Sequence, residues 1–185
     1  MVIGVSAGGL KALPVILAPF PADFPLAVVI VQHVSPDTDH RFFTQYLGQS
    51  TKLAVIEACE RERLMPGTVY IAPSNYHLLI EMEKTFALSI DDRVNFSRPS
   101  IDVLFESAAR AYRDSLIGVI LTGASSDGAA GLKQVKECGG LTLAQDPATA
   151  ESGFMPSAAI RSCQVDVIAR LEEIPTAILA ALGRH

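Results

Sequence analysis

The sequence has 185 residues, 49% of them hydrophobic and 19% charged, and a net charge of −5, which is the balance of one globular domain with its own core. Its apolar runs, such as 26–31, are too short to span a bilayer, and no basic segment precedes the first of them. No block of Lys or Arg could neutralise a row of phosphates. We therefore expect a cytoplasmic protein without a targeting segment, without membrane insertion and without a nucleic-acid partner; the sequence leaves the oligomeric state open.

The cysteine pattern gives no sign of a metal site. Cys59, Cys138 and Cys163 lie far apart, with no C-x-x-C motif and no histidine at ligand spacing. This spacing argues against zinc and favours buried thiols, so we expect no metal.

The first third of the chain alternates between strand and helix patterns. Val2–Val5 predicts a short strand, and Leu10–Ala18 predicts a helix. The continuous apolar run 26–31 is typical of a parallel strand buried on both faces. A helix over 39–47 and a short strand over 52–58 follow.

The middle of the chain predicts an antiparallel appendage. Residues 60–63 are charged and read as a solvated loop. Strands are predicted over 68–72, 76–81 and 85–90, and the last two are close enough to form a hairpin over 82–84.

The last part of the chain returns to alternation. The predicted elements are an amphipathic helix over 100–112, a buried strand over 116–122, a glycine-rich loop over 123–128, a helix through Cys138, a strand over 141–144, and helices over 156–161 and 174–182. This order predicts an α/β fold, with a doubly wound, mostly parallel sheet, helices on both faces and an antiparallel β-hairpin, all within a single domain over 1–185.

A serine stands at the first strand-to-helix turn. The run Gly4-Val5-Ser6-Ala7-Gly8 fits the G-x-S-x-G spelling of a nucleophile elbow, which lifts the serine hydroxyl off the sheet. The amides of residues 7–9 would lie at a helix N-terminus, where they favour a developing negative charge. The alternative is that Ser6 only caps the helix while the glycines allow close packing.

Two further polar residues follow predicted strands. His33 comes after the strand at 26–31, and Asp127 lies in the loop after the strand at 116–122. Carboxyl ends of parallel strands meet at one edge, where ligands bind. A hydroxyl, an imidazole and a carboxylate at that edge suit acyl transfer. Alternatively, His33 is an ordinary hydrogen-bonded histidine and Asp127 caps the helix after Gly128.

The remaining candidates are weaker. His40 lies on a predicted helix, His77 beside a hairpin strand and His185 at the end of the chain. A nucleotide site is also poorly supported, because Ser6 replaces the second glycine of G-x-G-x-x-G and neither Lys-Ser nor Lys-Thr follows Gly128.

Five separated motifs point to one family. They are Gly4–Gly9, Val31–His33, Arg98–Phe105, Leu121–Gly123 with Asp127–Gly131, and Ala144–Asp146 with Phe154–Pro156. In this order they resemble the catalytic domain of the chemotaxis protein-glutamate methylesterases, the CheB family, over nearly the whole chain. The order Ser, His, Asp differs from the Ser, Asp, His order of α/β-hydrolases, so the elbow is shared without that fold.

The resemblance implies a reaction and a set of residues. Enzymes of this family hydrolyse γ-glutamyl methyl esters on the cytoplasmic helices of chemoreceptors and release methanol. Ser6 is then the nucleophile, His33 the base and Asp127 the residue that orients His33, with the backbone amides of Ala7 and Ala124 as the oxyanion hole. The last two depart from the family, which commonly has threonine and methionine at these positions.

The resemblance also sets the alternatives. The same residues could serve mainly as a glutamine deamidase, or the fold could be kept as a catalytically silent docking module. The expected partner is a methylated receptor helical bundle. The receiver domain that family members often carry is absent from this sequence.

Overall fold

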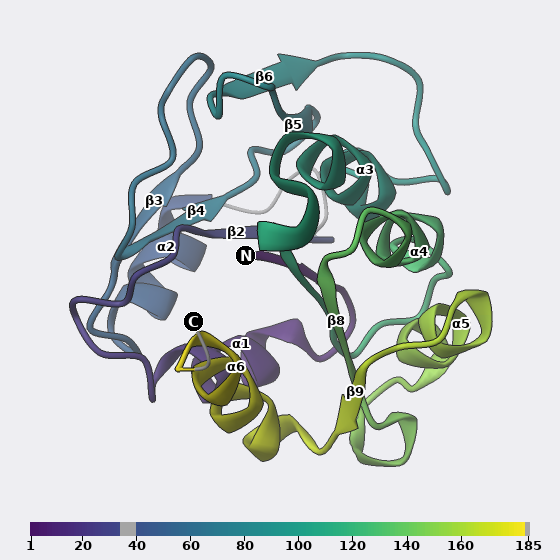
Figure 1. Cartoon of the computed structure of the whole chain (residues 1–185). Helices are drawn as coiled ribbons and strands as arrows, with labels where there is room; N and C mark the ends of the chain where they lie inside the picture. Colours follow the sequence, from purple (N-terminus) through teal and green to yellow (C-terminus); the bar gives the residue numbers. More distant parts are fainter. Residues whose placement is uncertain (34–39, 184–185) are drawn as a thin grey trace.

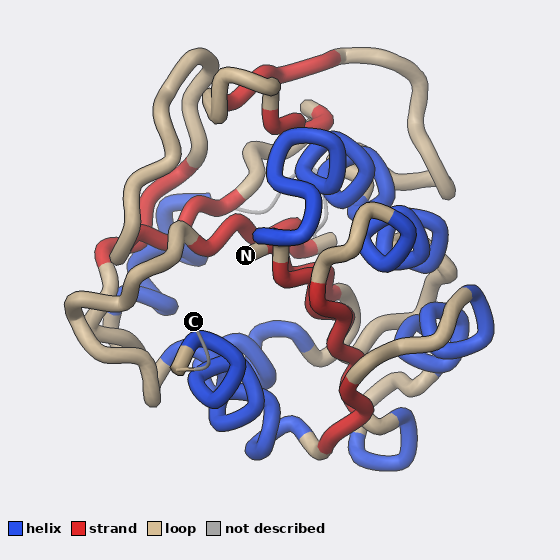
Figure 2. Tube along the Cα trace, viewed as in Figure 1, coloured by secondary structure: helices blue, strands red, loops and turns tan. Residues whose placement is uncertain are grey.

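Seven parallel strands form the central sheet of the protein (Figures 1 and 2). The computed structural model describes residues 1–33 and 40–183. The strand order is β3-β4-β2-β1-β7-β8-β9. The strands are β1 (Val2–Val5), β2 (Val28–Gln32), β3 (Ala54–Glu57), β4 (Thr68–Ile71), β7 (Ile117–Ile120), β8 (Leu141–Gln145) and β9 (Val167–Ala169). β1 lies in the middle of the sheet. The chain adds β2, β3 and β4 on one side of β1 and later adds β7, β8 and β9 on the other, as in doubly wound sheets.

Helices cover both faces of this sheet (Figure 1). One face carries α1 (Gly9–Leu17), α2 (His40–Gly48) and α6 (Ile174–Leu182). The other carries α3 (Ile101–Tyr112), α4 (Ala129–Glu137) and α5 (Phe154–Ser162). Short 3-10 helices lie at Arg113–Ser115, Pro147–Thr149 and Leu171–Glu173. The antiparallel pair β5 (His77–Ile80) and β6 (Phe86–Ser89) packs on the α3 side.

Neighbouring residues of a strand pack into two separate hydrophobic cores, one on each face of the sheet. Ile3 packs under α1 and α6, whereas Val2 packs under α3. Because successive side chains of a strand alternate between faces, an apolar run such as β2 fills both cores at once. The predicted α/β fold is therefore confirmed, including the hairpin.

Two predictions differ from the structure, and one strand was not predicted. β9 was not predicted, because a strand of three residues is too short to show a period. The helix predicted over 156–161 begins earlier, at Phe154. Cys59 is exposed and the other two cysteines are half-buried, so the prediction of buried thiols was wrong. Asp39, the predicted start of a helix, lies outside the described residues.

Within the described ranges, no helix is both long and apolar enough to cross a membrane.

Candidate active site

Ser6 and His33 are neighbours at the carboxyl edge of the sheet. β1 and β2 pair in parallel with Val5 opposite Gln32, so the next residue of each strand is the predicted site residue. The His33 amide extends this ladder by donating to the Val5 carbonyl over 3.0 Å. The sheet itself therefore places the serine and the histidine side by side.

The turn that carries Ser6 is held by its glycines. Gly8 adopts a φ of 85°, which glycine tolerates, and it is the N-cap of α1. The Gly9 amide donates to the Ser6 carbonyl over 3.0 Å, so of the three turn amides this one is already used. The N-cap of α1 is Gly8 and not Ser6, and no side chain makes a capping hydrogen bond there. The interpretation of Ser6 as a helix cap is therefore wrong.

The loop after β7 lies against Ser6. The Ser6 amide donates to the Thr122 carbonyl over 3.0 Å. A Cβ on Gly123 would stand only 3.0 Å from the Ser6 Cβ and 2.6 Å from the Met155 Cε, so any larger residue would push against Ser6 and displace the Met155 side chain. Within the described part of the chain, the exposed residues Ala7 and Ala124 have no acceptor for their amides, which leaves both N–H groups free to donate.

The structure joins His33 to Asp127. The His33 Nε2 lies 2.8 Å from the Asp127 Oδ2, and the two side chains are 14% and 0% exposed. The other ring nitrogen, Nδ1, has no hydrogen-bond partner among residues 1–33 and 40–183. It is therefore the nitrogen left for the neighbouring serine hydroxyl.

Asp127 does cap a helix, but not the one after it in the chain. Its Oδ2 accepts from the Ile101 amide over 2.7 Å, and its Oδ1 from the Asp102 amide over 3.1 Å. These are the first amides of α3. The N-cap of α4 is Gly128, so the interpretation of Asp127 as the cap of α4 is wrong.

Further donors fix the same carboxylate. The Ser100 hydroxyl donates to Oδ1 over 2.8 Å and the Asn95 Nδ2 donates to it over 3.1 Å. Burial acts to raise the pKa of Asp127, but the hydrogen bonds from His33, Ile101, Ser100 and Asn95 outweigh burial and leave the pKa below its ordinary value. Asp127 thus stays ionised and is held in one orientation.

A second buried carboxyl lies behind the first. Asp102 is 6% exposed, and it accepts from the Asn95 Nδ2 over 2.8 Å and from the Gly131 amide over 2.6 Å. Burial raises the pKa of Asp102 to about 6, the charge of Asp127 adds to the rise, and the bond from Gly131 opposes it. One Asn95 amide group therefore bridges two acidic side chains.

Gln32 clamps the two strand ends together. Its Nε2 donates to the Ser6 carbonyl over 2.9 Å and to the His33 carbonyl over 2.8 Å. A Cβ on Gly9 would lie 1.8 Å from the Gln32 Oε1, so the second glycine of the turn makes room for this side chain.

The other histidines do not join this site. His77 is buried; its Nδ1 accepts from the Ser100 amide over 3.2 Å, and its Nε2 lies 3.0 Å from the Asp92 carbonyl. His77 therefore binds the N-cap residue of α3. His40 is the first residue of α2, and nothing is described of its side chain; His185 lies outside the described residues.

Sequence reasoning missed Asn95, Asp102 and His77 as neighbours of the site. Ser100 and Asp102 entered the sequence analysis only as members of the motif Arg98–Phe105. This run keeps a polar pair at the first turn of a helix that is otherwise apolar on one side, which is the signal that could have found Asp102. Asn95 and His77 lie outside the run.

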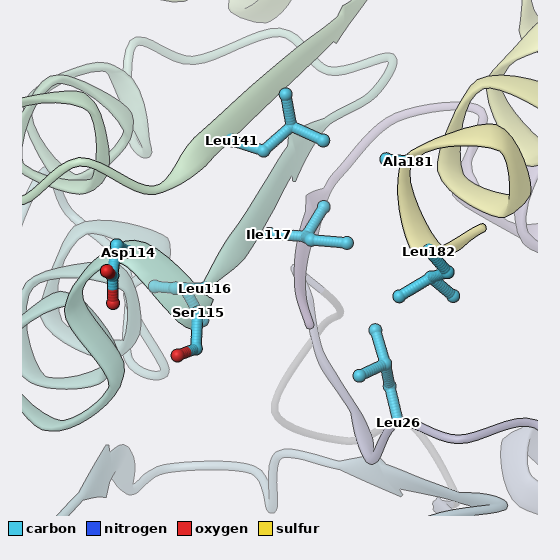
Figure 3. A pocket seen from close by; sticks show the side chains of 8 residues that line it. All are labelled: Leu26, Asp114, Ser115, Leu116, Ile117, Leu141, Ala181 and Leu182. Atoms are coloured by element: carbon cyan, nitrogen blue, oxygen red, sulfur yellow. The ribbon is translucent and has the colours of Figure 1, made fainter. Parts of the chain in front are cut away.

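One cavity lies away from this site. A cavity of about 370 Å³ opens at the amino-terminal edge of the sheet (Figure 3). It is lined by Leu26, Asp114, Ser115, Leu116, Ile117, Leu141, Ala181 and Leu182. Several of these residues precede or begin strands, whereas Ser6 and His33 follow the ends of strands, so the cavity is separate from the candidate site.

No cluster of three or more His, Cys, Asp or Glu side chains suited to a metal ion occurs over the ranges that the structure describes.

The fold and this site together define an α/β protein with a serine, a histidine and an aspartate at the carboxyl edge of a parallel sheet. These are the residue types that serine hydrolases use. The family profile of the CheB methylesterase matches residues 1–178, and the chain belongs to this family.

Relatives and a solved structure agree with this assignment. A relative from Leptospira interrogans is 55% identical over 174 residues, which cover 94% of this chain and 90% of the relative. A relative from Burkholderia pseudomallei, named protein-glutamate methylesterase/protein-glutamine glutaminase 1, is 42% identical over 99% of this chain and 50% of its own length. The crystal structure of the Thermotoga maritima CheB methylesterase catalytic domain matches with a TM-score of 0.93 and 34% identity, over 97% of this chain and 96% of that one.

Proposed function

We propose that this chain is a serine esterase that hydrolyses glutamate γ-methyl esters on the cytoplasmic helices of a chemoreceptor and releases methanol. It acts in the cytoplasm as one catalytic domain without a cofactor, and its partner is the methylated helical bundle. The observation that carries the proposal is the partly buried hydrogen bond between His33 and Asp127, with Ser6 next to His33 at the end of the neighbouring strand. The names of the relatives support the choice of substrate.

The first half of the reaction forms an acyl-enzyme. The Ser6 Oγ attacks the ester carbonyl carbon, and the His33 Nδ1 takes the hydroxyl proton. The carbonyl oxygen becomes an oxyanion, which the amides of Ala7 and Ala124 stabilise; such a donor is typically worth about 3 to 4 kcal/mol. The C–O bond to the methoxy group then breaks as His33 returns the proton to that oxygen, and methanol leaves.

The second half repeats the steps with water. His33 takes a proton from water, which attacks the acyl carbon; the bond to the Ser6 Oγ then breaks, and Oγ regains a proton. The product is the free glutamate carboxylate. Asp127 remains ionised throughout, holds the Nε2–H tautomer and stabilises the imidazolium.

Deamidation of a receptor glutamine is the second candidate function. The same steps apply with ammonia as the leaving group in place of methanol. Its support is that the Burkholderia pseudomallei relative carries both activities in its name.

The experiment uses a chemoreceptor cytoplasmic fragment carrying glutamate γ-methyl esters or the corresponding glutamines, with methanol and ammonia measured separately. We expect methanol release that Ser6→Ala and His33→Gln each reduce by roughly 10⁴-fold or more, with little further loss when they are combined, because the two residues act as a unit.

Ser115→Ala is the matched control, because Ser115 is an exposed serine at the opposite edge of the sheet. It should release methanol as the unchanged chain does. Ammonia without methanol would favour the deamidase. No product, and no labelling of Ser6 by a fluorophosphonate probe, would leave only the catalytically silent docking module.

A further inference from the structure

We propose that the tight turn at residues 94–97 is a docking element for the protein substrate, in which Phe96 contacts an apolar side chain next to the modified glutamate. This inference rests on the proposed function, because it names how that substrate is held. The turn lies in the segment between β6 and α3.

The turn is a two-residue hairpin of an unusual kind. Val94 and Ser97 exchange two backbone hydrogen bonds, of 3.2 and 2.9 Å, and form an antiparallel bridge. The two residues between them have positive φ angles, 49° at Asn95 and 63° at Phe96. Two positive φ angles in a two-residue hairpin are the signature of a type I′ turn, whose favoured sequence is Asn-Gly.

Phe96 therefore stands where folding alone would favour glycine. A residue with a Cβ is disfavoured in the left-handed region because the Cβ approaches its own backbone too closely, and bulky residues are outliers there. Phe96 recovers nothing by burial, because it is 95% exposed, the highest value among the large apolar side chains described. A strained, solvated aromatic contributes nothing to this chain's own stability, and strain of this kind is typical of sites that contact a ligand.

The turn is fixed to the candidate active site by Asn95, the first of its two central residues. The Asn95 Nδ2 donates to the Asp127 Oδ1 over 3.1 Å and to the Asp102 Oδ2 over 2.8 Å. Asp127 is in turn bonded to His33. Phe96 thus projects from a turn that is one hydrogen bond away from the carboxylate of the proposed triad.

The base of the turn is also held. The Arg98 guanidinium donates to the Ile90 carbonyl over 2.7 Å and to the Asp91 carbonyl over 3.0 Å, which ties the two sides of the segment together. The turn is anchored at its base and at Asn95, so its backbone is already ordered before a partner binds. Less conformational entropy is then lost when Phe96 contacts that partner. An exposed aromatic in such a position suits an apolar side chain on a helix surface, and aromatic residues often carry much of an interface's binding energy.

The test uses Phe96→Gly, which removes the ring and also relieves the backbone. We expect its melting temperature to equal or exceed that of the unchanged chain. With the methyl-esterified receptor fragment we expect KM to rise about tenfold, with a smaller change in kcat. Phe96→Tyr, which keeps an aromatic ring, should restore KM. Met82→Ala is the matched control: Met82 is 65% exposed in the β5–β6 turn, and its loss should leave KM unchanged.

Binding is measured in parallel, with the same fragment, on Ser6→Ala and on the double variant with Phe96→Gly. Weaker binding by the double variant supports docking even if no methanol is released, in which case the proposed reaction fails and the docking surface stands. Equal binding and equal KM would overturn the proposal. A fall in melting temperature in Phe96→Gly would also overturn it, because the residue would then be structural.

Discussion

Asp127 performs two tasks with one carboxylate. It holds His33, and it accepts hydrogen bonds from the first amides of α3, so the same oxygens orient the imidazole and cap the start of a helix. A negative charge at a helix N-terminus is stabilised by the helix dipole. This explains how a fully buried carboxylate remains ionised without a neighbouring Lys or Arg among its hydrogen-bond donors.

Asp102 gives a prediction at the same scale, about stability and pH. Its pKa is raised from 3.8 to about 6 in the folded protein, so the folded state holds this proton more tightly than the unfolded chain does. Its contribution to stability is complete below the unfolded pKa and is lost as the pH rises through about 6. A shift of this size corresponds to on the order of 2 to 3 kcal/mol.

Asp102→Asn removes this titration while keeping an oxygen for the Gly131 amide. The free energy of unfolding of the unchanged chain, minus that of the variant, should therefore fall as the pH rises from about 4 to about 6.5. Urea denaturation at a series of pH values measures it. Asp127 titrates with the opposite sign and at lower pH, and its charge interacts with Asp102, so the comparison is read in the upper part of this pH range, where Asp127 is ionised in both proteins. A difference that does not change with pH would contradict the prediction.

Three loops meet at Thr122, at the end of β7. The Thr122 hydroxyl donates to the Ala7 carbonyl over 2.8 Å and accepts from the Ser152 amide over 2.9 Å. The Thr122 amide donates to the Gln145 Oε1 over 3.0 Å. One small side chain thus orients the turn after Ser6 against the loops that follow β7 and β8.

Thr122→Val tests this junction, because valine has the same shape without the hydroxyl. It leaves a carbonyl and an amide unpaired, so we expect a loss of about 1 to 3 kcal/mol in the free energy of unfolding. Because the peptide after Ser6 is no longer fixed, kcat for methanol release should also fall, roughly 10- to 100-fold. Thr122→Ser keeps the hydroxyl and should retain most of both quantities. Equal kcat in the two variants would show that the hydroxyl does not position the turn.

Elements with a clear pattern of apolar residues were predictable from the sequence, and contacts between distant elements were not. The apolar runs identified β1, β2 and β7, and the rule for parallel sheets placed Ser6, His33 and Asp127 at one edge. The sequence could not show that Asp127 turns toward α3, because that choice depends on where α3 packs. β9 was missed because three residues carry no period, and Asn95 because its role needs a turn in the left-handed region.

The whole molecule is organised as two cores that share one sheet. Leu13 of α1 lies in the core on one face, and Leu104 of α3 lies in the core on the other; both are fully buried. If the helices on one face separated from the sheet, they would expose strands whose other side chains form the second core. This arrangement predicts that the described domain unfolds as one unit.

Leu13→Ala and Leu104→Ala test this unity from opposite faces. Each should lower the free energy of unfolding by about 2 to 5 kcal/mol, through lost burial and a residual cavity. The sheet separates the two sites, so the double variant should show the sum to within about 0.5 kcal/mol. The sequence has four tyrosines and no tryptophan, so tyrosine fluorescence and far-UV circular dichroism during urea denaturation are suitable measurements. The two signals should change at the same urea concentration in every variant, since a separate transition in either would mean that one face unfolds independently of the other.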